Sequence, residues 1–547
     1  MRASVQELLR RAEQLENGRR VFDAHWQQVA DYSLPSREFV RRQAPGAKRS
    51  VTLIFNTTAV LACEQLAGAL HGMLTSPALR WFALRPRRPD LRDDDDARKW
   101  FDAVTELMYA HFTSPEVGFD TALHEIYLDL SGFGTGCMFM PDRGQGGCGY
   151  EARPLAECYV SEGADGRIDT LFRLYTLPAR EVVRLWPETC PEAVQKIAEK
   201  TPDEPVKMMH ATWPEEDSEG KRHWPSCYAV RDQKTQLEEQ RFQDFPFAVP
   251  RWSKRSGEMY GNGPGMNALP DVKLVNKLEQ VDLRSRAKLC DPVLVLPDDG
   301  FLTPLTLDPG SVIYARPGLN KDDRPYPLST GGQPQLTEQK ITQVEQRIKA
   351  CYYTTWMNLP QQPNMTATEV LQRRDEMLRL MGPMIARVQS ELLGPVIART
   401  FAVMARNGLL PPLPDSLKSK DGKTEDYQVE YLSPLALAQR SSDAEQVQRW
   451  LGTMQPLIQA DPQVLDKVDA DAVAEFLAER NGVPARLMRD AASLTAYRQK
   501  RQQAADQQQQ AASLQALATA AQRGAGAAQI LNGMQQGAGG GAPAGGM

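Results

Sequence analysis

The stretch Met365-Thr366-Ala367-Thr368-Glu369-Val370 opens the segment that decides the fold, a helix predicted over residues 366–410. Thr366 and Glu369 have the S/T-x-x-E spacing of a capping box, which marks a helix start. Asn407-Gly408, followed by two prolines, marks the end of the helix. Residues 367–406 alone would form a rod of about 60 Å, which is longer than most globular domains need.

This helix has one apolar side and two predicted bends. Apolar residues recur along it at steps of three or four, among them Met384, Val388 and Leu392. Gly382-Pro383 and Gly394-Pro395 interrupt it, because each proline lacks a backbone donor and clashes one turn back. A long, bent, amphipathic helix favours packing against copies of itself in a ring. Met384, Val388 and Leu392 are therefore the predicted assembly residues.

Length and charge limit the class of protein. A chain of 547 residues is too long for one core and predicts several lobes. Its formal charge of −5 argues against a general polyanion binder, because affinity for nucleic acid comes from neutralising phosphates. If the chain meets DNA, we expect it to do so without holding it.

The sequence carries no pattern for catalysis, metal binding or a cofactor. The eight cysteines form no C-x-x-C pair. Gly132–Gly136 lacks the G-x-G-x-x-G spacing, and Gly261–Gly265 lacks the Lys-Ser/Thr of a phosphate loop. Asp93–Asp96 favours the start of a helix over residues 93–113, because acids stabilise a helix N-terminus. No apolar run of about 18 residues exists, so no membrane span is predicted.

The order of predicted elements indicates an α+β, mainly α, chain. Two N-terminal helices (3–33 and 56–74) precede a region of short strands between 133 and 250, with named runs at 137–140, 150–153, 158–160 and 171–175. Two helices of similar length then flank a proline-rich insert with strands at 293–296 and 311–315. Beyond residue 408 come a strand at 427–432, short helices to about 482, and a Gln/Ala/Gly-rich tail.

This order of features resembles the portal, or head-to-tail connector, of short-tailed double-stranded DNA phages of the podovirus type. The resemblance covers the chain from about Gln6 to Arg489 and depends on the order and spacing of its marks. The marks are Phe55-Asn56-Thr57-Thr58, Gly134-Thr135-Gly136, Tyr260-Gly261 with Pro264, Leu269–Lys273, and Met365–Val370 with Arg373, Glu376, Gly382-Pro383, Arg387, Glu391, Pro395 and Arg399.

The resemblance implies a portal fold with a fixed plan of segments. They are a wing (1–265), stem helix 1 (266–291), a β-containing clip (292–334), stem helix 2 (335–357), a tunnel loop (358–365), a long kinked helix joining wing to crown (366–410), a wing strand and helical crown (411–484), and a C-terminal helix or barrel with the tail (485–547).

The resemblance also implies a function and partners. The chain would form a ring, usually of twelve copies, at one capsid vertex of the virion after assembly in the host cytoplasm. Double-stranded DNA would pass through the ring during packaging and ejection. The expected protein partners are the terminase large subunit, tail adaptors, the major capsid protein, and scaffolding or internal core proteins. Twelve copies at −5 each would carry −60, which suits a conduit that does not grip DNA.

Two sets of residues are predicted to contact DNA or partners. The uncharged tips of the tunnel loop, Gln361, Gln362, Asn364 and Met365, would face the channel. The basic clip residues Arg316, Lys321 and Arg324 would contact DNA or an acidic partner, or else are solvated loop charges. An interhelical turn without a role in the channel is the alternative for residues 358–365.

Two other functional classes remain open at this point. One is an oligomeric scaffold outside a phage, which the Pro-rich insert and the absence of sustained heptads disfavour. The other is a nuclease or ATPase, which no phosphate loop, catalytic His pair or spaced carboxylate cluster supports.

Overall fold

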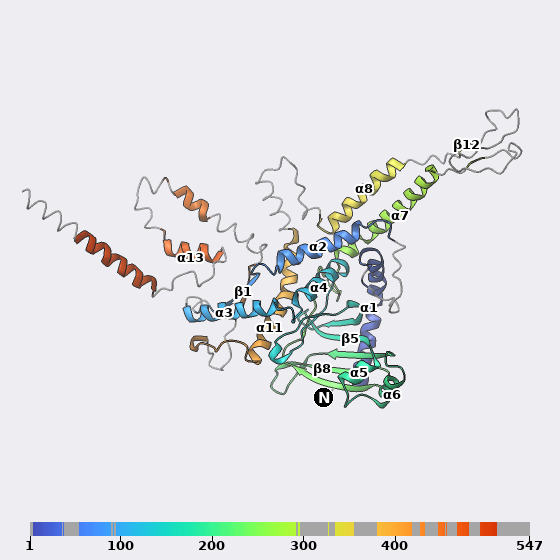
Figure 1. Cartoon of the computed structure of the whole chain (residues 1–547), viewed down its shortest axis with the longest axis horizontal. Helices are drawn as coiled ribbons and strands as arrows, with labels where there is room; N and C mark the ends of the chain where they lie inside the picture. Colours follow the sequence, from blue (N-terminus) through green and yellow to red (C-terminus); the bar gives the residue numbers. More distant parts are fainter. Residues whose placement is uncertain are drawn as a thin grey trace, which may run out of the picture.

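The computed structural model describes most of the chain, with gaps. The described residues are 4–35, 37, 54–88, 91, 94–290, 294–295, 326–327, 334–354, 380–417, 427–432, 447–454, 456, 468–480 and 493–510. Helices dominate, and short sheets lie among them (Figure 1). The mainly α, mixed architecture expected from the sequence is confirmed.

The N-terminal helices begin and pack as their residues dictate. α1 (Val5–Ser33) starts at Ser4, whose hydroxyl accepts from the Glu7 amide while the Glu7 carboxylate accepts from the Ser4 amide, a complete capping box. α2 (Thr58–Leu74) buries a side of small residues, and this allows close packing against α4 (Phe119–Phe133). The helices predicted at 3–33 and 56–74 are confirmed.

The acidic run before residue 97 starts a helix. Asp94 is the N-cap of α3 (Asp95–Phe112), and its side chain accepts a hydrogen bond from the Asp96 amide at 3.1 Å. The helix buries Trp100, Phe101 and Val104 in the main core. The prediction that this acidic run starts a helix is confirmed.

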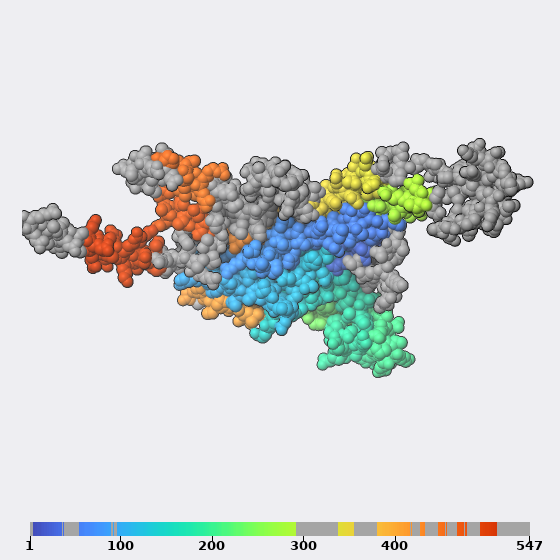
Figure 2. Space-filling view, turned by 45° about the horizontal axis from the view of Figure 1, so that its top comes forward, coloured from blue at the N-terminus to red at the C-terminus, as the bar shows by residue number. Residues whose placement is uncertain are grey.

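A six-stranded antiparallel sheet forms a lobe of its own. Its order is β4-β5-β6-β8-β7, with β9 also paired to β8, and the strands are β4 (Cys158–Glu162), β5 (Ile168–Pro178), β6 (Pro205–Thr212), β7 (Glu215–Glu216), β8 (Arg222–Val230) and β9 (Thr235–Phe242). Residues of α1 pack on it around Phe172 and Met209. A second core lies under α5 (Ala179–Leu185) and α6 (Glu192–Lys200). The lobe, coloured teal to green, projects from the body (Figure 2).

The sequence patterns found only part of this β region. The named runs at 158–160 and 171–175 are parts of β4 and β5. Those at 137–140 and 150–153 contain β2 (Met138–Phe139) and β3 (Glu151–Ala152), which form a small separate sheet with β10 (Phe247–Ala248). β6, β8, β9 and helix α4 were not named. Pro225 inside β8 and the charged exposed face of β9 obscure their alternation.

Two long helices leave the body together as an antiparallel pair, here called the α7–α8 hairpin. α7 runs from Pro264 to Cys290 and α8 from Pro334 to Cys351 (Figure 1). Between them the structure describes only β11 (Leu294–Val295) paired with β12 (Tyr326–Pro327). The predicted strand at 311–315 lies outside the described residues.

The prediction that the second helix of this pair reaches residue 357 is wrong. α8 ends at Cys351, and Tyr353 has a positive φ of 59° that ends the helical path. Both the local sequence and the tertiary packing cause the helix to end early. The run Tyr352-Tyr353-Thr354 has low helix propensity, and Tyr352 turns into the core, where it is fully buried.

The long helix is described from residue 380 onward. Its predicted start at Thr366 and Glu369 lies outside the described residues. No change of helix type occurs at Gly382-Pro383, but a π-helical turn (Gln389–Leu393) precedes α11 (Gly394–Arg406). The Gly394 amide donates to the Gln389 carbonyl, five residues back. Pro395 lacks an N–H and would crowd the Glu391 carbonyl, so a widened turn accommodates it. The predicted end is confirmed: Gly408 has a φ of 67° just past Asn407.

A strand from beyond the long helix returns to the N-terminal part of the body. The predicted strand at 427–432 is confirmed as β13 (Tyr427–Tyr431), which pairs antiparallel with β1 (Phe82–Pro86). Farther along, α13 (Ala470–Arg480) and a helix over 493–510 agree with the short helices and the helix-prone Gln/Ala segment. Among the described residues, no helix combines the length and apolar character of a membrane span.

Candidate functional site

The described residues offer a structural junction rather than a catalytic centre. No group of three His, Cys, Asp or Glu side chains among them is arranged to hold a metal ion. Polar contacts instead concentrate where the α7–α8 hairpin, the sheet lobe and the long helix meet the body. We take this junction as the candidate functional site, because it sets the directions of the α7–α8 hairpin and of the long helix relative to the body.

The base of the hairpin is clamped by the segment before α2. Asn276 of α7 accepts the backbone amides of Phe55 and Asn56 on one amide oxygen, at 2.7 and 3.1 Å. The Asn56 side chain donates to Glu345 of α8 at 2.7 Å and to Glu279 of α7 at 3.2 Å. One short segment therefore ties both helices at the same level, which explains the mark Phe55-Asn56-Thr57-Thr58.

Two glycine-rich motifs form a backbone crossing at the root of α7. The Trp252 amide donates to the Gly134 carbonyl at 2.8 Å, and the Gly261 amide donates to the Thr135 hydroxyl at 2.8 Å. A Cβ on Gly134 would lie 2.2 Å from the Gly263 amide nitrogen, and Gly134 itself has a φ of 79°. Only glycine fits here. The two motifs that failed as nucleotide loops thus pack against each other.

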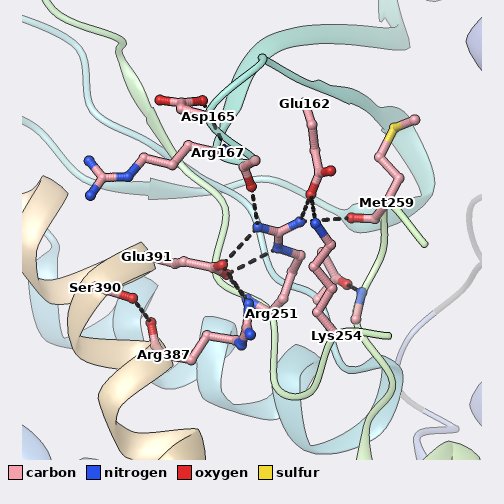
Figure 3. Close-up of polar contacts among 12 residues, drawn as sticks. Glu162, Asp165, Arg167, Arg251, Lys254, Met259, Arg387, Ser390 and Glu391 are labelled. Atoms are coloured by element: carbon pink, nitrogen blue, oxygen red, sulfur yellow. Dashed lines mark hydrogen bonds and ion pairs between the residues drawn. The ribbon is translucent and has the colours of Figure 1, made fainter. Parts of the chain in front are cut away.

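Arg251 is the centre of the junction (Figure 3). Its guanidinium is 2% exposed and donates to Glu391 of the π turn at 2.7 and 3.1 Å, while its backbone amide donates to the same carboxylate at 2.9 Å. It also pairs with Glu162 at the end of β4. A buried side chain in the loop after β10 therefore holds the sheet lobe and the long helix together.

Arg251, Lys254 and Arg387 together balance the charge of the two carboxylates, Glu162 and Glu391. Lys254 pairs with Glu162 at 2.5 Å, and Arg387 pairs with Glu391 at 3.0 Å. Burial alone would lower the pKa of Arg251, but the hydrogen bonds and charge of Glu391 and Glu162 raise it overall. Burial likewise acts to raise the pKa of Glu162, yet Lys254 and Arg251 hold it below its ordinary value. Arg251 and Glu162 therefore both stay charged near neutral pH.

A second buried arginine anchors the far half of the long helix. Arg399, 2% exposed, donates to the carbonyls of Met140 and Asp244 at 2.7 and 3.0 Å. At the next residue of the helix, the hydroxyl groups of Thr400 and Tyr150 share a hydrogen bond of 2.6 Å. Both contacts lead from α11 to the segment around the small β2-β3-β10 sheet. The helix is therefore fixed to the body on either side of its π turn.

Most of the predicted site residues lie outside the described part of the chain. These are the tunnel-loop residues Gln361, Gln362, Asn364 and Met365, and the clip residues Arg316, Lys321 and Arg324. The structure places the three assembly residues together on one side of the long helix, which faces the body of the same protomer.

The premise behind those assembly residues needs correction. Val388 and Leu392 are 1% and 0% exposed in a single protomer, and Met384 packs partly buried against the same core. The apolar stripe was expected to be left exposed for a neighbouring copy. The body of the protomer covers it instead, because α4, α7 and the end of α8 contribute to one continuous core with the long helix.

Several residues of the junction escaped the sequence patterns. Arg251 stands between a strand and a Gly-rich loop with no periodic signal, and its partners lie 89 and 140 positions away. Asn56, Glu391 and Arg399 did appear among the marks of resemblance, although no contact could be assigned to them. Single polar residues in loops reveal a pairing only after the chain has folded.

The fold and its junction define a structural protein with a projecting helical hairpin, a sheet lobe and a braced long helix. A family model for the bacteriophage head to tail connecting protein matches residues 5–488. Since the match covers most of the chain, the protein belongs to this family.

Two curated relatives extend the match over nearly the whole chain. It is 30% identical over 523 residues to the probable portal protein of Bordetella phage BPP-1, covering 91% of this chain and 92% of the relative. It is 28% identical over 496 residues to the portal protein of Salmonella phage epsilon15, covering 87% of each. The expectation of a portal protein rather than an enzyme is confirmed.

Solved structures give a weaker comparison. A chain from the virion of a native gene transfer agent particle is 13% identical and aligns over 78% of this chain and 94% of its own, with a TM-score of 0.38. A chain from the neck of an empty gene transfer agent particle gives 12% identity, 73% and 90% coverage, and a TM-score of 0.37. Scores this low add nothing to the family assignment.

Proposed function

We propose that this portal protein forms a closed ring of twelve copies at one vertex of a capsid. Double-stranded DNA passes through the ring during packaging and ejection, and the tail attaches to it. The family match over residues 5–488 is the observation that carries this proposal. The relatives named as portal proteins, which match 91% and 87% of this chain, support it.

Exposed apolar side chains on α7 support assembly. Leu274, Val281, Leu283 and Leu289 are 39%, 46%, 53% and 60% exposed in a single protomer. Four large apolar residues on one projecting helix cost free energy in water unless a partner covers them, at about 25 cal/mol for each Å² left exposed. A neighbouring copy in a ring supplies that cover through a heterologous contact that closes by rotation.

The segments take their roles from this arrangement. We assign α7 and α8 to the stem, residues 292–334 to the clip, residues 1–265 to the wing, and the chain beyond 411 to a wing strand, crown and C-terminal helix. Residues 358–365 form the tunnel loop, with Gln361, Gln362, Asn364 and Met365 toward the channel. Met384, Val388 and Leu392 act on assembly only indirectly, by holding the long helix in place.

The partners follow from the position of the ring in the virion. The terminase large subunit docks during packaging and tail adaptors dock afterwards. The clip residues Arg316, Lys321 and Arg324 are the proposed contacts with DNA or an acidic partner. The major capsid protein and scaffolding or internal core proteins contact the outside of the ring. Assembly takes place in the host cytoplasm.

Mass photometry of the purified protein tests the ring. Twelve copies of a 61.0 kDa chain give one species of about 730 kDa, and negative-stain images should show a central hole. A broad distribution of masses would instead indicate a scaffold or filament. An ATPase assay on the same sample should show no turnover.

A loop deletion tests the conduit separately from the ring. Replacing Gln361–Asn364 by two glycines should leave rings intact and reduce DNA packaging or retention. Normal packaging by the shortened protein would reduce the loop to a connector, and loss of rings would make it a structural element.

A further inference from the structure

The α7–α8 hairpin is basic although the chain as a whole is acidic. α7 and α8 together contain eight Lys and Arg residues and five Asp and Glu residues, a net charge of +3, in a chain of net charge −5. Positive charge is therefore concentrated on the projecting α7–α8 hairpin. What matters for binding is how many of these cations remain available.

Every acidic residue of the hairpin already has a partner within the protomer. Asp271 pairs with Arg347 at 2.7 Å. Asp282 and Glu338 share Arg286, at 2.6 and 3.2 Å. Glu279 and Glu345 accept the Asn56 amide. The remaining cations have no acidic partner among the described residues.

Four of those cations form one line on α7, here called the basic stripe. Lys273, Lys277, Arg284 and Lys288 are spaced by four, seven and four residues, which puts them on one face of the helix. All four are exposed. The line from the first to the last is about 22 Å long at the standard rise.

Among the residues that the structure describes, the side-chain partners of this stripe are neutral. Lys273 donates to the amide oxygen of Gln28 at 2.6 Å, and Lys277 donates to that of Gln280 at 3.2 Å. Glutamine oxygens orient an ammonium group without cancelling its charge. The same helix directs Arg286 to the opposite side, where it is paired with acids. α7 therefore separates its cations into a paired face and an unpaired face.

We infer that the basic stripe contacts the phosphates of the duplex DNA that the ring conducts. This inference rests on the proposed function, and it adds the surface by which the moving duplex is touched. A DNA strand presents a phosphate about every 3.4 Å along its axis, so a 22 Å line of cations meets phosphates at every register. Such contact favours no position of the duplex and imposes no sequence preference.

The local positive charge is compatible with the negative charge of the whole ring. At physiological salt, charges farther apart than about 8 Å are largely screened, so a phosphate responds to the stripe when it is close and hardly to the distant wing. Lysine side chains are long, and three of the four cations are lysines. They form contacts that break readily as the duplex moves.

The test measures binding of a short duplex to purified rings as a function of salt. The variant K273Q/K277Q/R284Q/K288Q removes the stripe, and K196Q/K200Q/K221Q/R222Q removes the same residue types from exposed positions on the sheet lobe. Each lost phosphate contact lowers the slope of log affinity against log salt by about 0.9. We expect the stripe variant to lose at least about 0.9, and up to about 3.6 for each protomer that touches the duplex. The sheet-lobe control should keep the wild-type slope.

The possible outcomes separate this inference from the proposed function. Wild-type rings that bind DNA with a slope unchanged in the stripe variant would overturn the inference and leave the function intact. Failure of the wild type to form rings would overturn the function itself. If the quadruple variant forms no rings, the four single variants are measured instead. Unchanged slopes in all four would show that the stripe serves contacts between subunits or with the capsid.

Conservative variants provide the second control. Replacing the three lysines by arginine keeps the charge and should keep the slope. Replacing Arg286 by glutamine changes a cation of the same helix that is already paired with acids, and should also leave the slope unchanged. If the salt-dependence slope of R286Q falls as much as that of the stripe variant, the total charge of the hairpin, and not the stripe, controls the affinity.

Discussion

The junction in the body and the projecting hairpin use the same residue types in opposite ways. In the junction, Arg251 and Arg399 are 2% exposed, and carboxylates or carbonyls surround them. On α7, Lys277, Arg284 and Lys288 are exposed without an acidic partner among the described residues. A buried cation without partners would be very costly, and the body gives each of these two arginines several acceptors. Water solvates the hairpin cations, which leaves them available for a ligand.

The apolar residues of the two regions differ in the same manner. Val388 and Leu392 of the long helix are covered by the protomer's own core, whereas Leu274 and Val281 of α7 are not. The core around the long helix is thus complete in one protomer. In the proposed ring, neighbouring copies would cover the apolar residues of the hairpin.

The largest expected effect comes from charging these two apolar pairs. V388D/L392D should prevent the protomer from folding, because each carboxylate is placed without a partner in the core, at several kcal/mol each. L274D/V281D should leave the protomer folded and block rings. Circular dichroism and mass photometry distinguish the two results. Folded monomers from V388D/L392D would mean that the long helix is free of the body.

Removing the central cation of the junction should have the next largest effect. Arg251→Met leaves Glu391 and Glu162 short of their main partner and should lower the free energy of unfolding by about 3–5 kcal/mol. Urea unfolding of the protomer measures this. The double variant R251M/E391M should recover part of the loss, because it removes one unpaired carboxylate. A loss below about 1 kcal/mol for R251M would contradict the assigned role.

A buried histidine should make the body acid-sensitive. Burial, with Arg173 and Arg153 nearby, lowers the pKa of His210 to about 3. Its pKa in the unfolded chain is about 6.5, so between these values the unfolded state binds more protons and stability falls as pH falls. The expected loss between pH 7 and pH 5 is about 2 kcal/mol. H210Q should remove this dependence, whereas replacement of the exposed His124 by Gln should retain it.

The smallest effect is expected for a paired cation of the hairpin. Arg286 is 50% exposed and bridges Asp282 and Glu338. Exposed ion pairs contribute at most about 1 kcal/mol, and the loss of a partner for Asp282, whose side chain is 8% exposed, adds to this. We therefore expect R286Q to lower the unfolding free energy by about 1–2 kcal/mol, less than R251M does. Urea midpoints of R286Q and R251M, compared side by side, measure the contrast between hairpin and body directly. Equal losses of unfolding free energy in R286Q and R251M would contradict the difference between hairpin and body.

The sequence predicted most of the long helices, although not α4, and it predicted their partners poorly. The acidic run before residue 97 and Asn407-Gly408 act within one turn of the chain, and both helix ends that they predicted are present. The end of α8 was missed because Tyr352 leaves the helix to enter a core assembled from distant segments. The burial of Val388 and Leu392 was missed because an amphipathic pattern shows which side is apolar, and not what covers it.

By itself the sequence determined the N-terminal helices, the two helices of the hairpin, the interruption of the long helix near Gly394-Pro395 and the resemblance to a portal. These depend on backbone preferences and on contacts three or four residues apart, which a linear pattern records. The tertiary structure alone decided that Arg251 joins Glu162 to Glu391, that Gly134 meets Gly263, and that β13 pairs with β1. It also decided which hairpin cations are neutralised. The physical reason is that charge pairing and burial are settled by distances in space, and residues more than a hundred positions apart leave no periodic trace of the contact they will make.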